Sequence, residues 1–303
     1  EILNNSLTSE NYYKDLASCP ADHCVKLLNP LSTDLDVMRQ TLLFGGLESI
    51  CHNINRRAAD LAMYEFGNVY FRNPQVMSTQ EAPLAPFSES GRLALWLTGD
   101  FRNANWSRAA QPATYFDLKA CVKNLLMRLG LWNGSVRIET LPAAETPDIF
   151  GAAQVVKTRS GKVLGHLGTV ARRLLAASDI KQEVFYAELE WNELVRLAAR
   201  TKVEFSPLPK TQPVKRDLAL LVDTAVTMEK IEETVRSAER KLLRDVELFD
   251  VYEGDKLPEG KKSYALSFIL EDKTRTLDEK TIEKAMRNLT AQFEQRCGAQ
   301  VRG

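Results

Sequence analysis

Eight residues in the last third of the chain have the chemistry that holds a nucleic acid. Two are aromatic rings, which stack on unpaired bases, and the others are cations or a hydroxyl, which contact phosphates and base edges. Each lysine taken alone is more often an ordinary solvated charge, so the hypothesis depends on the elements that position the whole set. The eight candidates are Lys215, Arg216, Phe249, Tyr252, Lys261, Lys262, Ser263 and Arg275.

The hydrophobic pattern of residues 205–303 predicts four strands and two helices in the order βαββαβ, which is the ferredoxin-like split fold. Thr227 is expected to cap the first helix, and a capping box starting at Thr276 is expected to open the second. Both helices must pack on one face of the sheet, so the other face is expected to be open. Strict alternation places Phe249 and Tyr252 on opposite faces, and only one ring can then meet RNA unless a β-bulge intervenes.

The first two thirds of the chain predict a different domain. Many short strands with few helices between them favour a mainly antiparallel sheet with helices packed on it, so the fold class is α+β. The clearest helix covers residues 34–57, with Thr33 as its expected N-cap. A stiff proline-rich segment at 205–213 places the boundary near residue 202 and predicts two domains, at 1–201 and 202–303.

Composition excludes several classes of function. The chain of 303 residues has 40 Lys+Arg and 40 Asp+Glu, so it lacks the positive charge of a non-specific polyanion binder. No apolar run approaches the roughly 18 residues that span a membrane. No signal peptide opens the chain, which begins at Glu1 and is interpreted as part of a longer protein. Five irregularly spaced cysteines indicate free thiols in a reducing cytoplasm. Cys19, His23 and Cys24 lack the second ligand pair of a zinc site, so no metal is predicted.

Several short segments carry a resemblance to a known family. Four of them, in the expected order, resemble a ferredoxin-fold anticodon-binding domain, and three earlier ones resemble a catalytic-like module. The segments are 213–219, 246–252, 257–263 and 275–277, with 29–32, 65–67 and 116–119. The whole chain therefore resembles the C-terminal part of the bacterial phenylalanyl-tRNA synthetase β subunit.

The resemblance implies a class II synthetase-like antiparallel module at 1–201, followed by a ferredoxin-like anticodon-binding domain at 202–303. It also implies a cytoplasmic assembly of two α and two β chains that binds tRNA(Phe). In that assembly the α subunit carries out aminoacylation with ATP and Mg²⁺, and no cofactor is expected in this part of the β chain.

The first domain is not expected to catalyse. A class II active site holds ATP phosphates with an arginine that normally stands two residues before a core-strand glutamate. Met63 takes that position before Glu65. Arg172 or Arg173 could serve as a second arginine after a glycine-rich strand, but a solvated basic helix is the simpler interpretation.

Three other titratable residues of this domain are also interpreted as structural. His166 stands alone in the sequence, without a nearby Cys or Ser in a triad arrangement. Glu188 and Glu190 alternate with apolar residues, which is typical of the solvated face of a strand. The sequence therefore predicts no catalytic residue.

A subunit interface is expected at the long helix, because such helices commonly lie at interfaces in class II proteins. Val37, Phe44, Gly45 and Gly46 are the candidates, since they lie outside the main apolar stripe or permit close approach. Packing of the same residues on the chain's own sheet is about equally expected.

Three alternative hypotheses about function follow from these observations. The first is a non-catalytic, tRNA-binding and α-binding part of phenylalanine–tRNA ligase. The second is an independently active ATP-dependent ligase, which the missing arginine argues against. The third is a purely structural protein-interaction module without RNA binding, which the neutral net charge favours.

Overall fold

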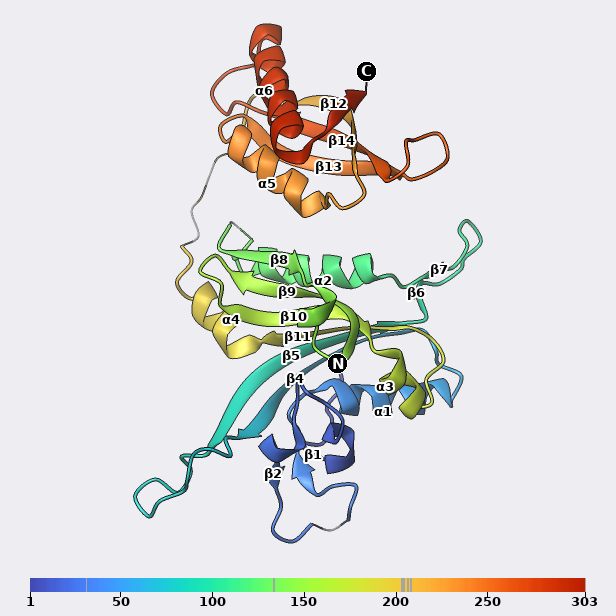
Figure 1. Ribbon diagram of the computed structural model, residues 1–303, viewed down its shortest axis with the longest axis vertical. Helices are drawn as coiled ribbons and strands as arrows, with labels where there is room; N and C mark the ends of the chain where they lie inside the picture. The colour runs from blue at the N-terminus through green and yellow to red at the C-terminus, as the bar shows by residue number, and fades with distance from the viewer. Residues whose placement is uncertain (31, 133, 203–204, 206, 208, 303) are drawn as a thin grey trace. The chain divides into compact units, whose positions relative to one another are not determined.

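The structure is a computed structural model that describes residues 1–30, 32–132, 134–202, 205, 207 and 209–302. The chain divides into two compact units, residues 1–203 and 204–303, and each is described by itself (Figure 1). Leu31, Ser206 and Leu208, which belong to segments interpreted above, lie outside the described residues. No helix within the described ranges is both long and apolar enough to cross a membrane.

A six-stranded antiparallel sheet forms the centre of the first unit. Its strand order is β4-β5-β11-β10-β9-β8. The strands are β4 (Leu61–Arg72), β5 (Phe87–Thr98), β8 (Val136–Thr140), β9 (Phe150–Thr158), β10 (Val163–Val170) and β11 (Val184–Glu190).

Helices cover both faces of this sheet. They are α1 (Leu43–Ile54), α2 (Tyr115–Arg128), α3 (Arg172–Ala177) and α4 (Trp191–Ala198). Side chains alternate along the strands between two hydrophobic cores. Trp96 and Tyr186 pack in one core with α1 and α3, whereas their neighbours Leu97 and Phe185 pack in the other with α2 and α4. The predicted antiparallel sheet with packed helices is confirmed.

Smaller elements complete the first unit. A three-stranded sheet and a two-stranded sheet accompany three 3₁₀ turns. They are β1 (Leu7–Thr8), β2 (Val25–Lys26), β3 (Val37–Met38), β6 (Asp100–Arg102), β7 (Gln111–Pro112), η1 (Glu10–Tyr13), η2 (Ala21–His23) and η3 (Ala143–Glu145).

The prediction of one helix over 34–57 was wrong in its first half. Helix α1 begins only after Leu42, which has no side-chain capping bond, so Thr33 is not the N-cap. The preceding backbone is held by long-range pairing instead. The amide of Asp36 donates to the carbonyl of Thr8 at 3.1 Å, and that of Arg39 to the carbonyl of Ser6 at 2.9 Å. Apolar spacing does not reveal such partners.

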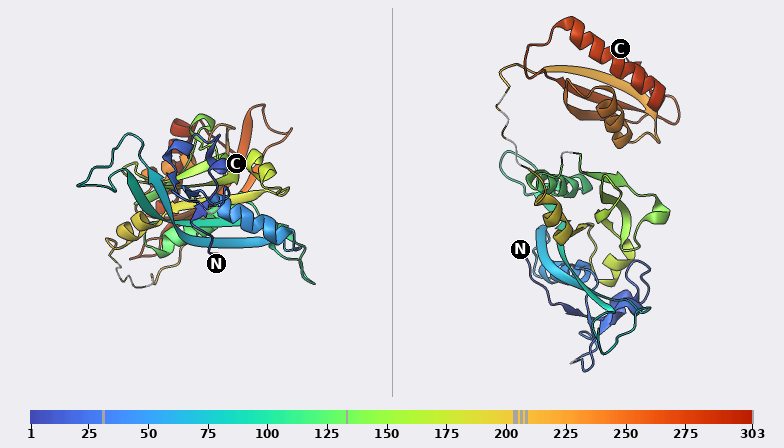
Figure 2. Two further views of the ribbon diagram at one scale, coloured as in Figure 1. Left: turned by 90° about the horizontal axis from the view of Figure 1, so that it is seen from below. Right: turned by 90° about the vertical axis from the view of Figure 1, so that its left-hand side faces the viewer.

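The second unit has the predicted order βαββαβ. Its elements are β12 (Val214–Asp223), α5 (Met228–Ala238), β13 (Leu243–Tyr252), β14 (Lys261–Leu270), α6 (Glu279–Cys297) and β15 (Gln300–Arg302). The strand order is β13-β14-β12-β15, and α6 runs along the sheet (Figure 2). Thr227 caps α5 as predicted, and Gly298 ends α6 in the left-handed conformation with φ 59°. The N-cap of α6 is Asp278, so the predicted capping box at Thr276 was wrong.

The two faces of this sheet differ in their cover. Directly opposed residues of paired strands share a face. On β14, Tyr264, Leu266 and Phe268 pack in the core beneath α5 and α6. The residues that alternate with them, Ser263, Ala265, Ser267 and Ile269, therefore belong to the opposite face, which no described helix of this unit covers. We call it the open face.

Candidate functional site

Four of the eight predicted RNA-binding residues belong to the open face. Lys215 opposes Ile269, Lys261 opposes Asp223, and Tyr252 opposes Ser263. The candidates among these residues are Lys215, Lys261 and Tyr252, which come from three different strands, and Ser263. Their common face follows from strand register, which the pairing of β12, β13 and β14 fixes.

A β-bulge decides the position of the aromatic rings. Leu248 opposes Leu266 and Asp250 opposes Ala265, so Phe249 is an extra residue in β13. The bulge shifts the alternation by one residue and brings Tyr252 to the open face. Phe249 and Tyr252 are 58% and 40% exposed, so both rings meet solvent on this edge strand.

Three other candidates lie elsewhere in the second unit. Arg216 opposes a core-facing residue and binds both carboxylate oxygens of Glu279 in α6, at 2.9 and 3.0 Å. Lys262 is buried, and its ammonium lies 4.8 Å from the centre of the Tyr264 ring. Arg275 pairs with a neighbouring aspartate at 3.3 Å. The structure therefore does not bring the eight candidates together as one patch.

Carboxylates outnumber cations on the open face. Strands β12 and β14 contribute the cations Lys215 and Lys261 to it, and these lie 3.9 and 4.0 Å from carboxylate oxygens of Glu247 and Asp223. Register adds three further acidic residues to this face, which are Asp217, Asp245 and Asp250. Repulsion by these carboxylates disfavours phosphate on the open face, whereas an uncharged base can still stack there.

A separate groove in the same unit is basic. It has a volume of about 950 Å³ and is bordered by the segments after α5 and β14 and by the first turns of α6. Its acidic residues are all engaged, since Glu239 accepts backbone hydrogen bonds and Glu271 and Asp272 pair with arginines. The groove also has three lysines that form no ion pair among the residues described. They are Lys241, Lys273 and Lys284.

Arg275 is the predicted residue that borders this basic groove, and Arg244 is its other arginine. The three lysines were missed by the sequence analysis. They come from separate segments of the chain, and each is an ordinary surface residue in its own segment. Lysines near the predicted ends of the helices and strands could have suggested the groove, but only the fold brings them to one place.

In the first unit, the predicted interface residues are covered by the chain itself. Val37 and Phe44 are buried, and the Phe44 ring stacks on Tyr12 with centroids 4.5 Å apart. A Cβ atom added to Gly46 would lie 2.1 Å from the ring of Trp96, and one added to Gly45 would meet Asn4 at 2.9 Å. Close approach at this glycine pair therefore serves packing within the chain, and a role at a subunit interface stays a prediction.

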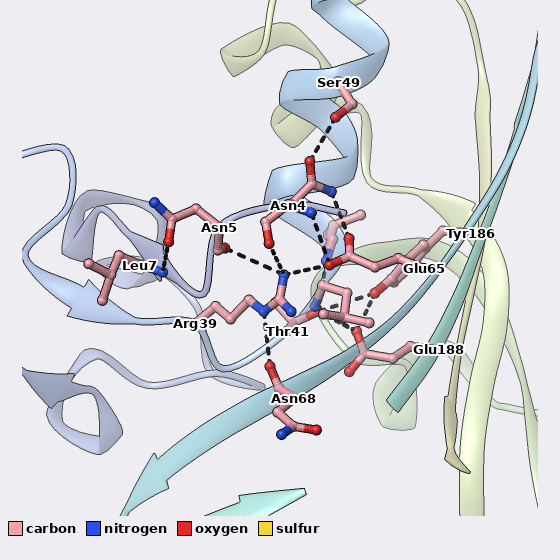
Figure 3. A network of polar contacts seen from close by, with 12 residues as sticks. Asn4, Asn5, Leu7, Arg39, Thr41, Ser49, Glu65, Asn68, Tyr186 and Glu188 are labelled. Carbon is pink, nitrogen blue, oxygen red and sulfur yellow. Dashed lines mark hydrogen bonds and ion pairs between the residues drawn. The ribbon is translucent and has the colours of Figure 1, made fainter. Parts of the chain in front are cut away.

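Glu65 is engaged in a buried ion pair (Figure 3). Its carboxylate lies 2.7 Å from a guanidinium nitrogen of Arg39, and both side chains are buried. Arg39 Nε donates to the carbonyl of Asn68 at 2.9 Å, and the Asn4 side-chain amide donates to Glu65 at 2.7 Å. The partner of this glutamate thus comes from the segment between β3 and α1, and its role is structural.

A polar cavity of about 160 Å³ lies on the same face of the six-stranded sheet as Trp96. Glu188 and His166 line it, so the prediction that Glu188 is solvated was wrong, whereas a structural role for His166 stays a prediction. Glu188 is held because Thr41 donates to it at 2.5 Å, and Tyr186 also donates to it. The adjacent Glu190 pairs with Arg92 at 2.7 Å.

The cavity does not have the protonation states of a nucleophilic site. Burial raises the pKa of the Cys19 thiol to about 12, so this cysteine is protonated at neutral pH. Burial also lowers the pKa of His166, which is therefore neutral. Arg173 is engaged by Asp148 at 3.2 Å, and neither it nor Arg172 lines the cavity. Within the described part of the chain, no group of three or more potential metal ligands is found.

Two family models match the chain. Residues 1–191 match the phenylalanyl-tRNA synthetase β-chain CLM domain, and residues 209–302 match the ferredoxin-fold anticodon-binding domain. The second match covers both the open face and the basic groove.

Proteins similar to the whole chain carry one name. Phenylalanine–tRNA ligase β subunits of Porphyromonas gingivalis, Bacteroides fragilis and Geobacillus kaustophilus are 47%, 46% and 31% identical to it. The chain is covered completely in all three comparisons but spans 36% of the length of each relative. Among solved structures, the pyrrolysyl-tRNA synthetase PylSc of Desulfitobacterium hafniense is 13% identical, with a TM-score of 0.46 over 66% of this chain and 63% of that one.

Proposed function

Because the chain belongs to the phenylalanyl-tRNA synthetase β-chain family, we propose that it forms a non-catalytic part of phenylalanine–tRNA ligase. In this role its second unit binds the anticodon end of tRNA(Phe), and its first unit packs against the catalytic α subunit. The holoenzyme would be a cytoplasmic assembly of two α and two β chains that uses ATP and Mg²⁺. The observation that carries the RNA-binding role is the exposed Tyr252 on an open face within the matched anticodon-binding domain.

We propose different contacts for bases and for phosphates. An unpaired base stacks on Tyr252, because this ring lies on a face whose carboxylates repel phosphate. The RNA backbone is attracted to the basic groove instead, where Lys273 and Lys284 have no acidic partner among the described residues. The groove begins near the residues of β13 and β14 farthest from Tyr252, so only an RNA of several nucleotides reaches both sites.

The lack of catalysis follows from the first unit. Met63 stands where an arginine would be needed, and the buried cation that pairs with Glu65 is Arg39, whose Nε and one terminal nitrogen are engaged. No guanidinium there is free to hold ATP phosphates. Phenylalanine-dependent exchange of pyrophosphate into ATP by this chain alone should therefore stay at background.

A binding titration tests the RNA-binding role. Wild type, Tyr252→Ala and Lys273→Ala/Lys284→Ala are compared for binding to tRNA(Phe) and to its anticodon stem-loop, with Lys230→Ala, an exposed lysine of α5, as control. Loss of one stacked base should weaken binding by about 5- to 150-fold. Loss of the two lysines should reduce the dependence of affinity on salt, whereas the control should change neither quantity.

The second candidate function is a protein-interaction module without RNA binding, and the acidic open face favours it. If all four proteins bind tRNA equally weakly while the α chain still co-purifies with wild type, the RNA-binding proposal fails and this alternative stands.

A further inference from the structure

The polar cavity of the first unit contains two hydrogen-bond acceptors that the protein leaves free. Gln40 is 2% exposed, and its Oε1 has no partner among the described residues. Its other terminal atom, Nε2, donates to the carbonyl of Pro20 at 2.8 Å, so the amide is fixed in place. A buried acceptor without a donor costs free energy, so a donor from another molecule would stabilise this arrangement.

Glu188 supplies the second acceptor. Its Oε2 is saturated, because it accepts from the Thr41 hydroxyl at 2.5 Å, from the Leu42 amide at 3.1 Å and from the Tyr186 hydroxyl. Its Oε1 accepts no hydrogen bond from the described residues, since Arg92 lies 3.8 Å away, which is too far for one. One carboxylate oxygen is therefore held rigidly in place while its capacity to accept is unused.

The charge of Glu188 is only weakly compensated at the cavity. Arg92 lines the cavity with it, but the shorter contact of Arg92, at 2.7 Å, is to Glu190 outside the lining, against 3.8 Å to Glu188. His166 is neutral because burial lowers its pKa. A cation entering the cavity would therefore be favoured over a neutral molecule or an anion.

The remaining walls are apolar. Phe71, Pro147, Ile149 and Phe150 line the same space. The volume of about 160 Å³ is close to that of a protein cavity of roughly 150 Å³ that accepts benzene. The cavity therefore has room for about one ring-sized molecule, and phenyl rings attract a nearby cation.

We propose that this cavity binds a small primary ammonium compound, whose ammonium group donates to Glu188 Oε1 and Gln40 Oε1 while its apolar body lies against Phe71 and Phe150. The ammonium is carried by a free amine or by an α-amino acid. The two sources differ at Arg92, because its Nε has no partner among the described residues and could donate to a carboxylate. The inference concerns the first unit and is independent of RNA binding by the second.

Calorimetric titration of the whole chain with four ring-sized probes tests the proposal. Benzylamine carries the ammonium alone, L-phenylglycine adds a carboxylate to it, benzyl alcohol is the neutral analogue, and phenylacetate carries the carboxylate alone. Benzylamine should bind at millimolar concentration or below, and benzyl alcohol and phenylacetate should bind at least tenfold more weakly. Tighter binding of L-phenylglycine than of benzylamine would assign the site to α-amino acids, and weaker binding would assign it to amines.

Substitutions locate the site. Glu188→Gln should weaken benzylamine binding at least tenfold, whereas Glu89→Gln, which removes the same charge from an exposed position on β5, should leave it unchanged. If Glu188→Gln unfolds, the comparison of benzylamine with benzyl alcohol on wild type decides alone. Equal binding of these two probes would reduce the cavity to an apolar one, and failure of benzylamine to bind would overturn the proposal.

Discussion

The buried pair of Arg39 and Glu65 gives the sharpest prediction about the first unit. Replacing either residue by Met removes one charge and leaves the other without its partner in a site where both side chains are less than a tenth exposed. Breaking a buried pair in this way costs about 3–5 kcal/mol. Each single variant should therefore lower the free energy of unfolding of the first unit by about that amount.

The double variant Arg39→Met/Glu65→Met should be more stable than either single variant. It leaves no buried charge, and its main remaining cost is the loss of five hydrogen bonds. Two are short, at the Asn68 carbonyl and the Asn4 side-chain amide, and three are 3.3–3.5 Å long, at the Asn4 amide and the Asn4 and Asn5 carbonyls. At about 1 kcal/mol for each short bond and less for each long one, the total is about 2–4 kcal/mol. This ordering distinguishes a buried ion pair from two independent side chains, whose costs would add.

Tryptophan fluorescence in urea measures these changes in the first unit alone, because the four tryptophans of the chain are at positions 96, 106, 132 and 191. The control is Lys26→Met, which breaks a pair with Glu10 at the same distance of 2.7 Å but with the lysine 61% exposed. Exposed pairs contribute about 0–1 kcal/mol, so this variant should stay close to wild type. Single variants as stable as the control, or a double variant at the sum of the singles, would refute the argument.

Two further predictions concern the same unit. Gly46→Ala should destabilise it by about 1–3 kcal/mol in the same urea assay, because the new Cβ would lie 2.1 Å from the buried Trp96 ring. This cost outweighs the better helix propensity of Ala. The control is Gly151→Ala, which should be tolerated because the nearest atom to its new Cβ is 3.5 Å away. The pKa of His166 is lowered from 6.5 by burial, so below about pH 6.5 the unfolded chain binds a proton that the folded chain refuses. Stability should therefore fall as the pH drops from about 6.5 towards the folded-state pKa and level off below it. His166→Gln should make the urea midpoint depend less on pH between about pH 7.5 and pH 5. A midpoint that changes with pH as steeply as in wild type would contradict a neutral buried histidine.

The second unit was predictable because its signals are local. The alternation of β12 and β14, the Thr227 cap and the stop at Gly298 each depend on residues close together in the chain, and all are confirmed. The choice of Asp278 over Thr276 as N-cap was not predictable, since both residue types serve as caps and only backbone geometry separates them. The extra residue at Phe249 was equally hidden, because a bulge changes register without changing the hydrophobic pattern.

The first unit was less predictable because its polar side chains find partners far along the chain. Glu188 alternates with apolar residues as a solvated side chain would, but it accepts from Thr41, which is 147 positions away. The start of α1 was misplaced for the same reason, since the segment before Leu43 pairs with the chain's first residues. Periodicity describes one element at a time, and these contacts join elements that periodicity treats separately.

Free and engaged cations distinguish the basic groove of the second unit from the buried ion pairs of the first. Phosphate binding requires a cation whose charge is not already matched by a carboxylate. In the first unit, Arg39 and Arg92 are held by Glu65 and Glu190 at 2.7 Å, so a phosphate would have to displace a carboxylate from each. In the second unit, the groove lysines are exposed and unpaired among the described residues. Attraction for a phosphate therefore resides in the basic groove rather than at these two buried arginines, although the chain's net charge is zero.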